Sequence, residues 1–515
     1  MFVPFSVNDF LVRAEGVYGD RVGLVDEPDQ PAASWGAITY RELGRRARAQ
    51  AAGLDHLGVG VGERVAIVSH NAARLLTSFF GVSGSGRVLV PVNFRLSPPE
   101  IAYIVDHSGA SVLMVDPELD ESLAEITAKH RFVLGSGTDR ELFGVGAETR
   151  PEPREWEPDE GATATINYTS GTTARPKGVQ LTHRNIWVNG VTFGLHAGVG
   201  DRDVYLHTLP MFHCNGWGMP YVAAGLGVPQ IVLRKVDGDE ILRRIDRYGV
   251  TYLCGAPAVL AAVLGAAQRW EGEIPGRGRV RVICAGAPPP SRTIQRVETE
   301  LGWEFIQIYG LTETAPLLTF NRRRSEDDDA PIEVAAHRLS RAGAPALGVR
   351  LRISDDDEVL ARSNVVLEGY WAQPEATADA IEDGWFHTGD GGYVDEEGYL
   401  TISDRKKDII ITGGENVSSI EVEDVVFSHP QVAEVAVIGV PDEKWGETIK
   451  ALVVLVPDST LTEQELLDYA RERLTHFKCP TSIEFRDVLA RTATGKLQKY
   501  LLRADYWAGQ QRQVN

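Results

Sequence analysis

Short apolar runs alternate with longer segments of helical periodicity through most of this chain. Five runs rich in β-branched residues predict strands, at 64–70, 111–117, 162–170, 250–256 and 280–286. Residues 39–58 and 237–249 predict helices, and in the second segment Ile241, Leu242 and Ile245 recur at helical spacing. Because strands that alternate with helices form largely parallel sheets covered on both faces, the pattern predicts an α/β fold.

The pattern changes near residue 404. Beyond it, the periodicity predicts a helix, two strands and a second helix, at 420–431, 432–440, 449–457 and 462–474. This order predicts a small α+β unit, so we expect two domains, residues 1–404 and 405–515. A highly charged run at 321–333 predicts a solvated surface loop.

Length and charge narrow the class of protein. The chain has 515 residues, too many for one compact core, and its 43% hydrophobic and 24% charged residues are typical of a globular enzyme. A net charge of −20 argues against nucleic acid as a partner, because phosphate binding needs a basic face. The four cysteines form no C-x-x-C pair, and no signal peptide or membrane-spanning run is evident, so we expect a cytoplasmic protein.

The stretch YTSGTTARPKG at 168–178 surrounds one lysine, Lys177, with hydroxyls and glycines. We expect it to be a loop between the strand at 162–170 and a helix within 181–194. Backbone N–H groups and hydroxyls in such a loop can bind phosphate oxygens, and a lysine adds a point charge. It is not a Walker A loop, because Lys177 precedes Gly178. An ordinary Ser/Thr/Gly loop is the alternative.

Three further segments carry polar residues suited to a nucleotide. YGLTETAP at 309–316 offers Tyr309 to stack on a base and Glu313 to hold Mg²⁺. DGWFHTGD ends in Asp390, a carboxylate suited to a ribose diol, and TATGKLQK carries Lys496 in a glycine turn. Each segment alone could be an ordinary surface loop.

Together and in this order, these motifs resemble the adenylate-forming superfamily from about residue 10 to residue 505, and fatty acyl-CoA synthetases most closely. The superfamily includes acyl-CoA synthetases, aryl-CoA ligases, peptide-synthetase adenylation domains and beetle luciferase. The resemblance implies that a carboxylic acid and ATP form an acyl-adenylate, whose acyl group then passes to coenzyme A. It also implies a large N-terminal domain of parallel-rich sheets with a β-barrel-like subdomain, and a small mobile C-terminal domain.

The resemblance assigns nucleotide-binding roles to individual residues. It implies that the phosphates are held by the loop and by one later threonine, namely Thr169, Ser170, Gly171, Thr172, Thr173, Lys177 and Thr312. It places adenine between two segments, Tyr309–Gly310 and Gly286–Ala287–Pro288. It implies that Glu313 and Thr169 bind Mg²⁺ and that Asp390 and Arg405 bind the ribose. Ala174 stands where relatives often have glycine.

The same resemblance assigns the catalytic steps. Lys496 would bridge the α-phosphate and the carboxylate during adenylation, with Thr169, His213 and Glu313 beside the reacting groups. The C-terminal domain would then rotate about Lys407 and bring Gly413 and Gly414 toward the site, where they leave room for the thiol arm of coenzyme A.

The acid site is expected around residues 209–221. The resemblance implies that His213, Trp217, Gly286 and Gly310 line it, with Trp217 as the gate of an acyl tunnel. Small neighbours leave room for a long ligand or allow close packing, namely Gly216, Gly218, Ala223, Ala224 and Gly225. No aspartate lies between Met211 and Tyr221, which argues against an amino acid. We predict a medium- to long-chain fatty acid.

Several alternatives stay open at this point. The acyl acceptor could be a carrier protein instead of coenzyme A, and the chain could be a catalytically silent binding homologue. A homodimer is possible. The segment before the strand expected at 365–371 is shorter than in relatives and is expected to lack one hairpin edge.

Overall fold

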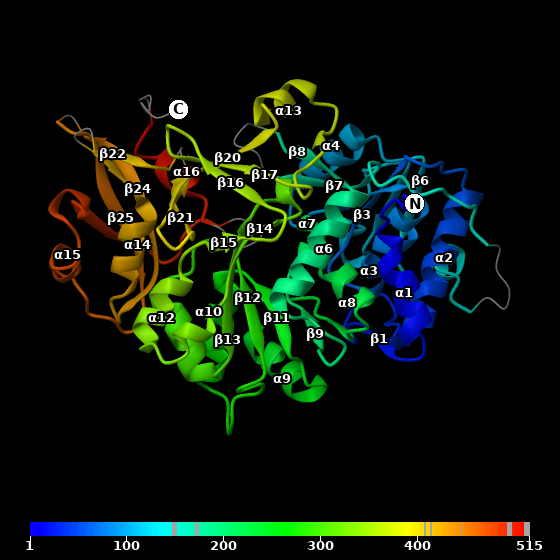
Figure 1. Cartoon of the computed structure of the whole chain (residues 1–515), viewed down its shortest axis with the longest axis horizontal. Coiled ribbons are helices and arrows are strands. Elements are labelled where there is room, and N and C mark those ends of the chain that lie inside the picture. Colours follow the sequence, from blue (N-terminus) through cyan, green and yellow to red (C-terminus); the bar gives the residue numbers. More distant parts are fainter. Residues whose placement is uncertain are drawn as a thin grey trace.

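The computed structural model describes residues 1–146, 152–169, 175–405, 408–412, 415–442, 444–491 and 497–508. These residues form four β-sheets with helices packed around them (Figure 1). Among these residues, no helix combines the length and the apolar character needed to cross a bilayer.

The first sheet has nine strands and is parallel through its centre. Its strand order is β15 (Ala344–Pro345), β14 (Leu317–Asn321), β13 (Glu304–Gly310), β12 (Arg281–Cys284), β11 (Tyr252–Gly255), β9 (Tyr205–His207), β10 (Gln230–Val232), β1 (Val22–Val25) and β2 (Ala37–Thr39). Strands β1 and β9 to β13 run parallel, while the pairs β1–β2, β13–β14 and β14–β15 are antiparallel.

The second sheet has seven strands and the third has five. The second runs β18 (Gly369–Tyr370), β8 (Lys177–Thr182), β7 (Thr163–Thr169), β4 (Val88–Val92), β3 (Arg64–Val68), β5 (Val112–Val115) and β6 (His130–Val133). The third is antiparallel throughout and contains β16 (Arg350–Ile353), β17 (Glu358–Arg362), β20 (Trp385–Val394), β19 (Ile381–Glu382) and β21 (Leu400–Arg405). A β-barrel-like subdomain was expected without a residue range, and the third sheet is an antiparallel sheet of the large N-terminal part.

The fourth sheet lies at one end of the molecule (orange in Figure 1). It contains β23 (Glu415–Val417), β22 (Ile410–Thr412), β25 (Gly446–Leu455), β24 (Val432–Asp442) and β26 (Ser482–Phe485). Its apolar core is drawn from residues between Ile410 and Ile483. The predicted helices and strands of this unit are confirmed by α14, β24, β25 and α15.

Sixteen α-helices accompany these strands in the described part of the chain. They are α1 (Asn8–Tyr18), α2 (Tyr40–His56), α3 (Ala73–Gly81), α4 (Pro98–Ser108), α5 (Ser136–Glu141), α6 (His183–Ala197), α7 (Cys214–Trp217), α8 (Met219–Gly225), α9 (Gly238–Tyr248), α10 (Pro257–Ala267), α11 (Ser291–Arg296), α12 (Ile332–Leu339), α13 (Pro374–Ala380), α14 (Ser419–Phe427), α15 (Glu463–Arg471) and α16 (Lys499–Ala504).

The strands and helices expected in the first 300 residues are confirmed. The five predicted runs contain β3, β5, β7, β11 and β12, and the two predicted helices are α2 and α9. In α9, Ile241, Leu242 and Ile245 are buried, and the Asp237 side chain accepts a hydrogen bond from the Glu240 N–H at the first turn. This cap fixes where the helix begins.

One local expectation is wrong and two are met only in part. β16 and β17 pair as a hairpin before residue 365, and Asp357 takes the left-handed φ of 62° that the tight turn needs. In the run expected as a strand, only Gly369–Tyr370 pairs. Residues 321–333 are not simply a solvated loop, because Arg324 and Arg338 form ion pairs with the largely buried Asp327 and α12 begins at Ile332.

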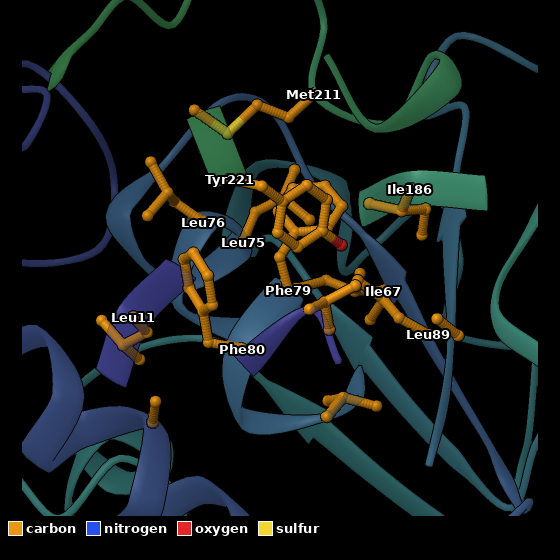
Figure 2. Packing of buried hydrophobic residues seen from close by; sticks show 14 of the residues in the cluster. Leu11, Ile67, Leu75, Leu76, Phe79, Phe80, Leu89, Ile186, Met211 and Tyr221 are labelled. Atoms are coloured by element: carbon orange, nitrogen blue, oxygen red, sulfur yellow. The ribbon is translucent and has the colours of Figure 1, made fainter. Parts of the chain in front are cut away.

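A buried core joins the second sheet to helices on its face (Figure 2). Tyr221 of α8 packs edge-on against Phe79 and Phe80 of α3, with ring centroids 5.6 and 5.5 Å apart. Met211 belongs to the same core. The segment expected to line the acid site, residues 209–221, is therefore anchored in the core by Met211 and Tyr221.

Polar contacts join the fourth sheet's unit to the rest of the molecule, and we call them the seam. The Ser291 N–H donates to Asp424 Oδ1 at 3.0 Å, and Arg292 donates to the His429 carbonyl at 2.9 Å. The Ser419 N–H donates to Asp404 Oδ2 at 2.9 Å. The seam thus links α11 and the end of β21 to α14 and the residues after it.

Candidate active site

The polar stretch at 168–178 joins two antiparallel strands, not a strand and a helix. β7 ends at Thr169, β8 begins at Lys177, and these two residues are register partners. Val179 and Leu181 alternate inward along β8, and α6 begins only at His183. The expected strand-to-helix placement is therefore wrong, because the alternating residues after the loop favour a strand. Four predicted phosphate-binding residues lie outside the described residues, namely Ser170, Gly171, Thr172 and Thr173.

Glu313, Tyr370 and Lys177 lie together next to this hairpin. The Tyr370 hydroxyl donates to Glu313 Oε1 at 3.0 Å, and the Lys177 ammonium lies 4.8 Å from the centre of the Tyr370 ring. The Glu313 carbonyl also accepts from the Leu367 N–H at 2.7 Å. Burial and the Glu313 charge raise the pKa of Tyr370, so its hydroxyl stays a donor to the carboxylate.

Tyr309, Asp390 and Arg405 form a second group. The Tyr309 hydroxyl donates to Asp390 Oδ2 at 2.7 Å, while Arg405 Nε lies 3.5 Å from Asp390 Oδ1. Asp390 and Arg405 are register partners in β20 and β21, so the sheet itself sets their spacing. Burial, together with the Asp390 charge, raises the pKa of Tyr309 well above its usual value.

The segment 286–288 lies beyond the end of β12, beside β13. Cys284 pairs with Gln307 in the parallel ladder, which brings Gly286–Ala287–Pro288 level with Tyr309 two residues further on. These three residues are exposed, and Tyr309 is half-buried. The two predicted walls of the base site are thus neighbours, and Thr312 and Glu313 follow in a short 3₁₀ turn.

Gly310 is needed for a close backbone approach. A Cβ at this position would lie 1.6 Å from the Pro316 carbonyl oxygen, and backbone atoms cannot move aside easily. We expect Gly310→Ala to lower the free energy of unfolding by about 3 kcal/mol, the upper end of overpacking costs. Urea unfolding followed by circular dichroism measures it. Gly16→Ala is the matched control, because a Cβ there meets nothing within 4 Å and a helix favours alanine. Equal stability of the two variants would contradict this account.

His213 precedes an unusual left-handed turn that contains Trp217. Cys214, Asn215, Gly216, Trp217 and Gly218 have φ values of 45°, 53°, 58°, 60° and 80°. A left-handed turn costs an L-residue roughly 1–2 kcal/mol. The Trp217 side chain is buried, with only 5% exposed, in a cluster that includes Phe193 and Met219.

Packing accounts for several of the small residues near Trp217. A Cβ on Gly225 would lie 2.5 Å from the Phe10 ring of α1, and one on Gly218 would lie 2.7 Å from the Asn189 amide. Ala223 and Ala224 are fully buried in apolar clusters. The structure therefore favours close packing over the acyl tunnel that the small residues led us to expect.

Four predicted site residues of the C-terminal part lie outside the described residues, namely Lys407, Gly413, Gly414 and Lys496. Their surroundings are described. Arg491 pairs with Leu497 across the segment that contains Lys496. Thr412 pairs with Glu415 across the two glycines.

Sequence reasoning missed one residue of the site, Tyr370. It contacts Glu313, which lies 57 residues earlier in the chain, and Lys177, which belongs to the neighbouring strand β8. No motif spacing links these segments. The aromatic pair in GYW, at the end of the run 365–371, is the signal that the sequence offers.

The carboxylate and hydroxyl near the hairpin fit Mg²⁺. Glu313 and Thr169 offer oxygen ligands, and within the described ranges no cluster of three or more metal-binding side chains exists. Mg²⁺ commonly uses one or two carboxylates with phosphate oxygens and water, and needs no all-protein cage. The donor set therefore suits a metal that arrives with a nucleotide.

The large domain of parallel-rich sheets, the small fourth-sheet unit and the polar segments that meet around Tyr309 and Glu313 form the architecture of adenylate-forming enzymes. Residues 13–371 match the AMP-binding enzyme family, and residues 421–496 match the AMP-binding enzyme C-terminal domain. The chain belongs to the AMP-binding enzyme family. It is an acid–CoA ligase that works through an acyl-adenylate and uses ATP and coenzyme A, with the Mg²⁺ that is typical of the family.

Curated relatives align along nearly the whole chain. The 4-hydroxybutyrate–CoA ligase 2 of Metallosphaera sedula is 36% identical over 525 aligned residues, covering 96% of this chain and 93% of the relative. The 2-methylpropanoate–CoA ligase CCL4 of Humulus lupulus is 37% identical, covering 97% of this chain and 95% of the relative.

Solved structures agree in fold. ATP-bound MatB from Rhodopseudomonas palustris superposes with a TM-score of 0.84 at 29% identity, covering 97% of this chain and 99% of that one. A fatty acyl CoA synthetase of Mycobacterium tuberculosis superposes with a TM-score of 0.74 at 31% identity, covering 98% and 99%. The sequence-based expectations of family and fold class are confirmed.

Proposed function

We propose that this enzyme activates a short aliphatic carboxylic acid and transfers it to coenzyme A. The proposal that the site binds ATP rests on one observation: residues from distant segments of the chain contact one another in two groups. Lys177, Tyr370 and Glu313 form one group, and Tyr309, Asp390 and Arg405 form the other. The short segment from Tyr309 to Glu313 joins the two groups.

In this proposal the two groups bind opposite ends of ATP. Asp390 and Arg405 bind the ribose hydroxyls, and adenine lies between Tyr309 and the exposed segment 286–288. The hairpin loop from Thr169 to Lys177 and the Thr312 hydroxyl bind the phosphates. A lysine suits this task because its ammonium is a compact charge that can reach several phosphate oxygens.

Glu313 and Thr169 would hold the metal ion, which supplies positive charge where pyrophosphate leaves. Tyr370 fixes the Glu313 carboxylate, because its hydroxyl donates to one of the two carboxylate oxygens. Lys496 would bridge the α-phosphate and the substrate carboxylate. We further propose a domain boundary after Asp404, rotation about Lys407, and a passage for the thiol arm at Gly413 and Gly414.

A short acid is supported by the packing around Trp217. The indole is buried. The space beside the small residues of α8 is occupied by Phe10 and by the apolar core. His213 and Trp217 would therefore bound a shallow site, with Gly286 and Gly310 on its other side. Relatives named for 4-hydroxybutyrate and 2-methylpropanoate agree with an acid of this size.

A medium- to long-chain fatty acid is the second candidate, as the sequence led us to predict. It is favoured by the likeness to the mycobacterial fatty acyl CoA synthetase and by the position of Trp217, whose movement would open a longer path. The two candidates differ in what Trp217 does: it is a fixed wall for a short acid and a gate for a long one.

Mass spectrometry of the products tests the proposal. The enzyme is incubated with ATP, Mg²⁺ and unbranched acids from acetate to palmitate, with benzoate as the aryl comparison, with and without coenzyme A. We expect acyl-CoA from acids of two to six carbons. Acyl-CoA mainly from longer acids would favour the second candidate. Acyl-AMP that accumulates despite coenzyme A would point to a carrier protein, and no product from any acid would favour a silent binding homologue.

Tyr370→Phe is expected to raise the Mg²⁺ concentration needed for half-maximal adenylation about tenfold. The change removes only the hydroxyl that donates to Glu313, and such a bond to a charged group is worth about 1.5–3 kcal/mol. Pyrophosphate release at varied Mg²⁺ measures it. Tyr309→Phe is the matched variant, because it removes a hydroxyl from Asp390 instead, and it should change the KM for ATP and leave the Mg²⁺ requirement unchanged. The same Mg²⁺ requirement in both variants would contradict the assignment.

The homodimer and the cytoplasmic location stay predictions from the sequence.

A further inference from the structure

Three buried polar side chains form a closed ring of hydrogen bonds beneath the left-handed turn. Thr165 Oγ1 donates to Asn167 Oδ1 at 2.9 Å, and Asn167 Nδ2 donates to Asn215 Oδ1 at 3.1 Å. Asn215 Nδ2 donates back to Thr165 Oγ1 at 2.9 Å. The three residues are 0–2% exposed, so water does not reach the ring. Each side chain therefore depends on the other two for its hydrogen bonds.

The ring connects the two halves of the proposed active site. Thr165, Asn167 and Thr169 alternate along β7, so they lie on one face of the strand, with Thr169 at the edge of the phosphate loop. Asn215 lies in the turn at 214–218, between His213 and Trp217. The ring therefore joins the strand that leads to the phosphate loop to the turn that bounds the acid site.

A second asparagine holds the other end of this turn. Asn189 of α6 donates to the Trp217 carbonyl at 3.3 Å and accepts from the Leu317 N–H at 3.2 Å. The Asn189 side chain is fully buried. Trp217 is thus fixed by its own carbonyl and by Asn215 two residues before it, in a backbone conformation that L-residues rarely adopt.

We propose that Thr165, Asn167 and Asn215 are positioning residues that lock the left-handed turn and so set the longest acid the enzyme accepts. This inference rests on the proposed function. With the ring intact, Trp217 stays a wall of the acid site. With one member removed, the turn can relax toward the commoner right-handed or extended backbone, and Trp217 leaves its place. Acids longer than the natural substrate should then gain access.

The test compares the ratio of kcat/KM for octanoate to kcat/KM for butyrate in four variants. Thr165→Val removes only the ring hydroxyl, and Asn215→Gly removes the side chain while keeping tolerance of positive φ. We expect the ratio to rise at least tenfold in both, mainly through the KM for octanoate. Thr165→Ser restores the hydroxyl and should return the ratio toward that of the unchanged enzyme.

Thr163→Val is the matched control. It makes the same substitution in the same strand and removes the hydrogen bond from Gln180 at 3.0 Å, away from the turn. Its ratio should equal that of the unchanged enzyme. Thermal unfolding of every variant verifies that it is folded. A uniform loss with all acids, or an unchanged ratio in both ring variants, would overturn the inference while leaving the proposed function intact. Failure of the unchanged enzyme to activate any acid would overturn both.

Discussion

Replacing Lys496 with alanine is expected to lower acyl-adenylate formation by about 10²–10³-fold, the usual loss when one positioned donor is removed from a charged transition state. Two anions, the carboxylate and the α-phosphate, must approach each other before pyrophosphate leaves. A lysine between them offsets their repulsion. Transfer of the acyl group from supplied acyl-adenylate to coenzyme A should fall much less, because in that step no carboxylate has to approach the phosphates of ATP.

The two half-reactions are measured separately, adenylation by pyrophosphate release and transfer by the thioester formed from supplied acyl-adenylate. Lys444→Ala serves as the control, because Lys444 is an exposed lysine of the same C-terminal unit. It should leave both half-reactions unchanged. Full adenylation by the Lys496 variant would remove this residue from the proposed mechanism.

Glu313→Gln should lower adenylation at least 10²-fold at millimolar Mg²⁺, since a metal ion's stabilisation of the leaving phosphates is worth several kcal/mol. The amide keeps the size of the side chain and an oxygen that can accept from Tyr370, so the change removes mainly charge. Excess Mg²⁺ should recover part of the rate.

Its control is Glu368→Gln, an exposed glutamate two residues before Tyr370. Pyrophosphate release across a range of Mg²⁺ concentrations distinguishes the two variants. If the Glu313 variant needs no more Mg²⁺ than the control, Glu313 does not bind the metal, and the carboxylate has another role.

Local pattern alone predicts much of this fold. The strands β3, β5, β11 and β12 and the helix α9 follow from apolar periodicity, because each is buried along its whole length or along one face. The sequence did not predict that β7 and β8 pair as a hairpin through residues 169–177. A loop of glycine and hydroxyl residues can connect a strand to a second strand or to a helix. Whether a strand or a helix follows depended on only two inward residues, Val179 and Leu181.

Site residues that lie inside a sequence motif could be predicted. Those that contact the site from other segments could not. Tyr309, Glu313 and Asp390 were expected from their own segments. Tyr370 and Asn167 were not expected, because their hydrogen-bond partners lie far along the chain. The sequence alone does not show which distant side chains are in contact. Such contacts are set by sheet register and helix packing, which a single sequence does not define.

The separate core of the fourth sheet has an energetic consequence. That core contains residues only from Ile410 to Ile483 among those described, so the sheet's orientation could change while the core stays assembled. The free-energy cost of reorientation then falls on the seam, where Ser291, Arg292 and Asp404 bond to the C-terminal unit. Water can replace each of these bonds at a net cost of about 0.5–1.5 kcal/mol for a neutral pair and more for a charged one. The rotation proposed about Lys407 would therefore exchange a few polar bonds with water, and bound substrates that favour one orientation would drive it.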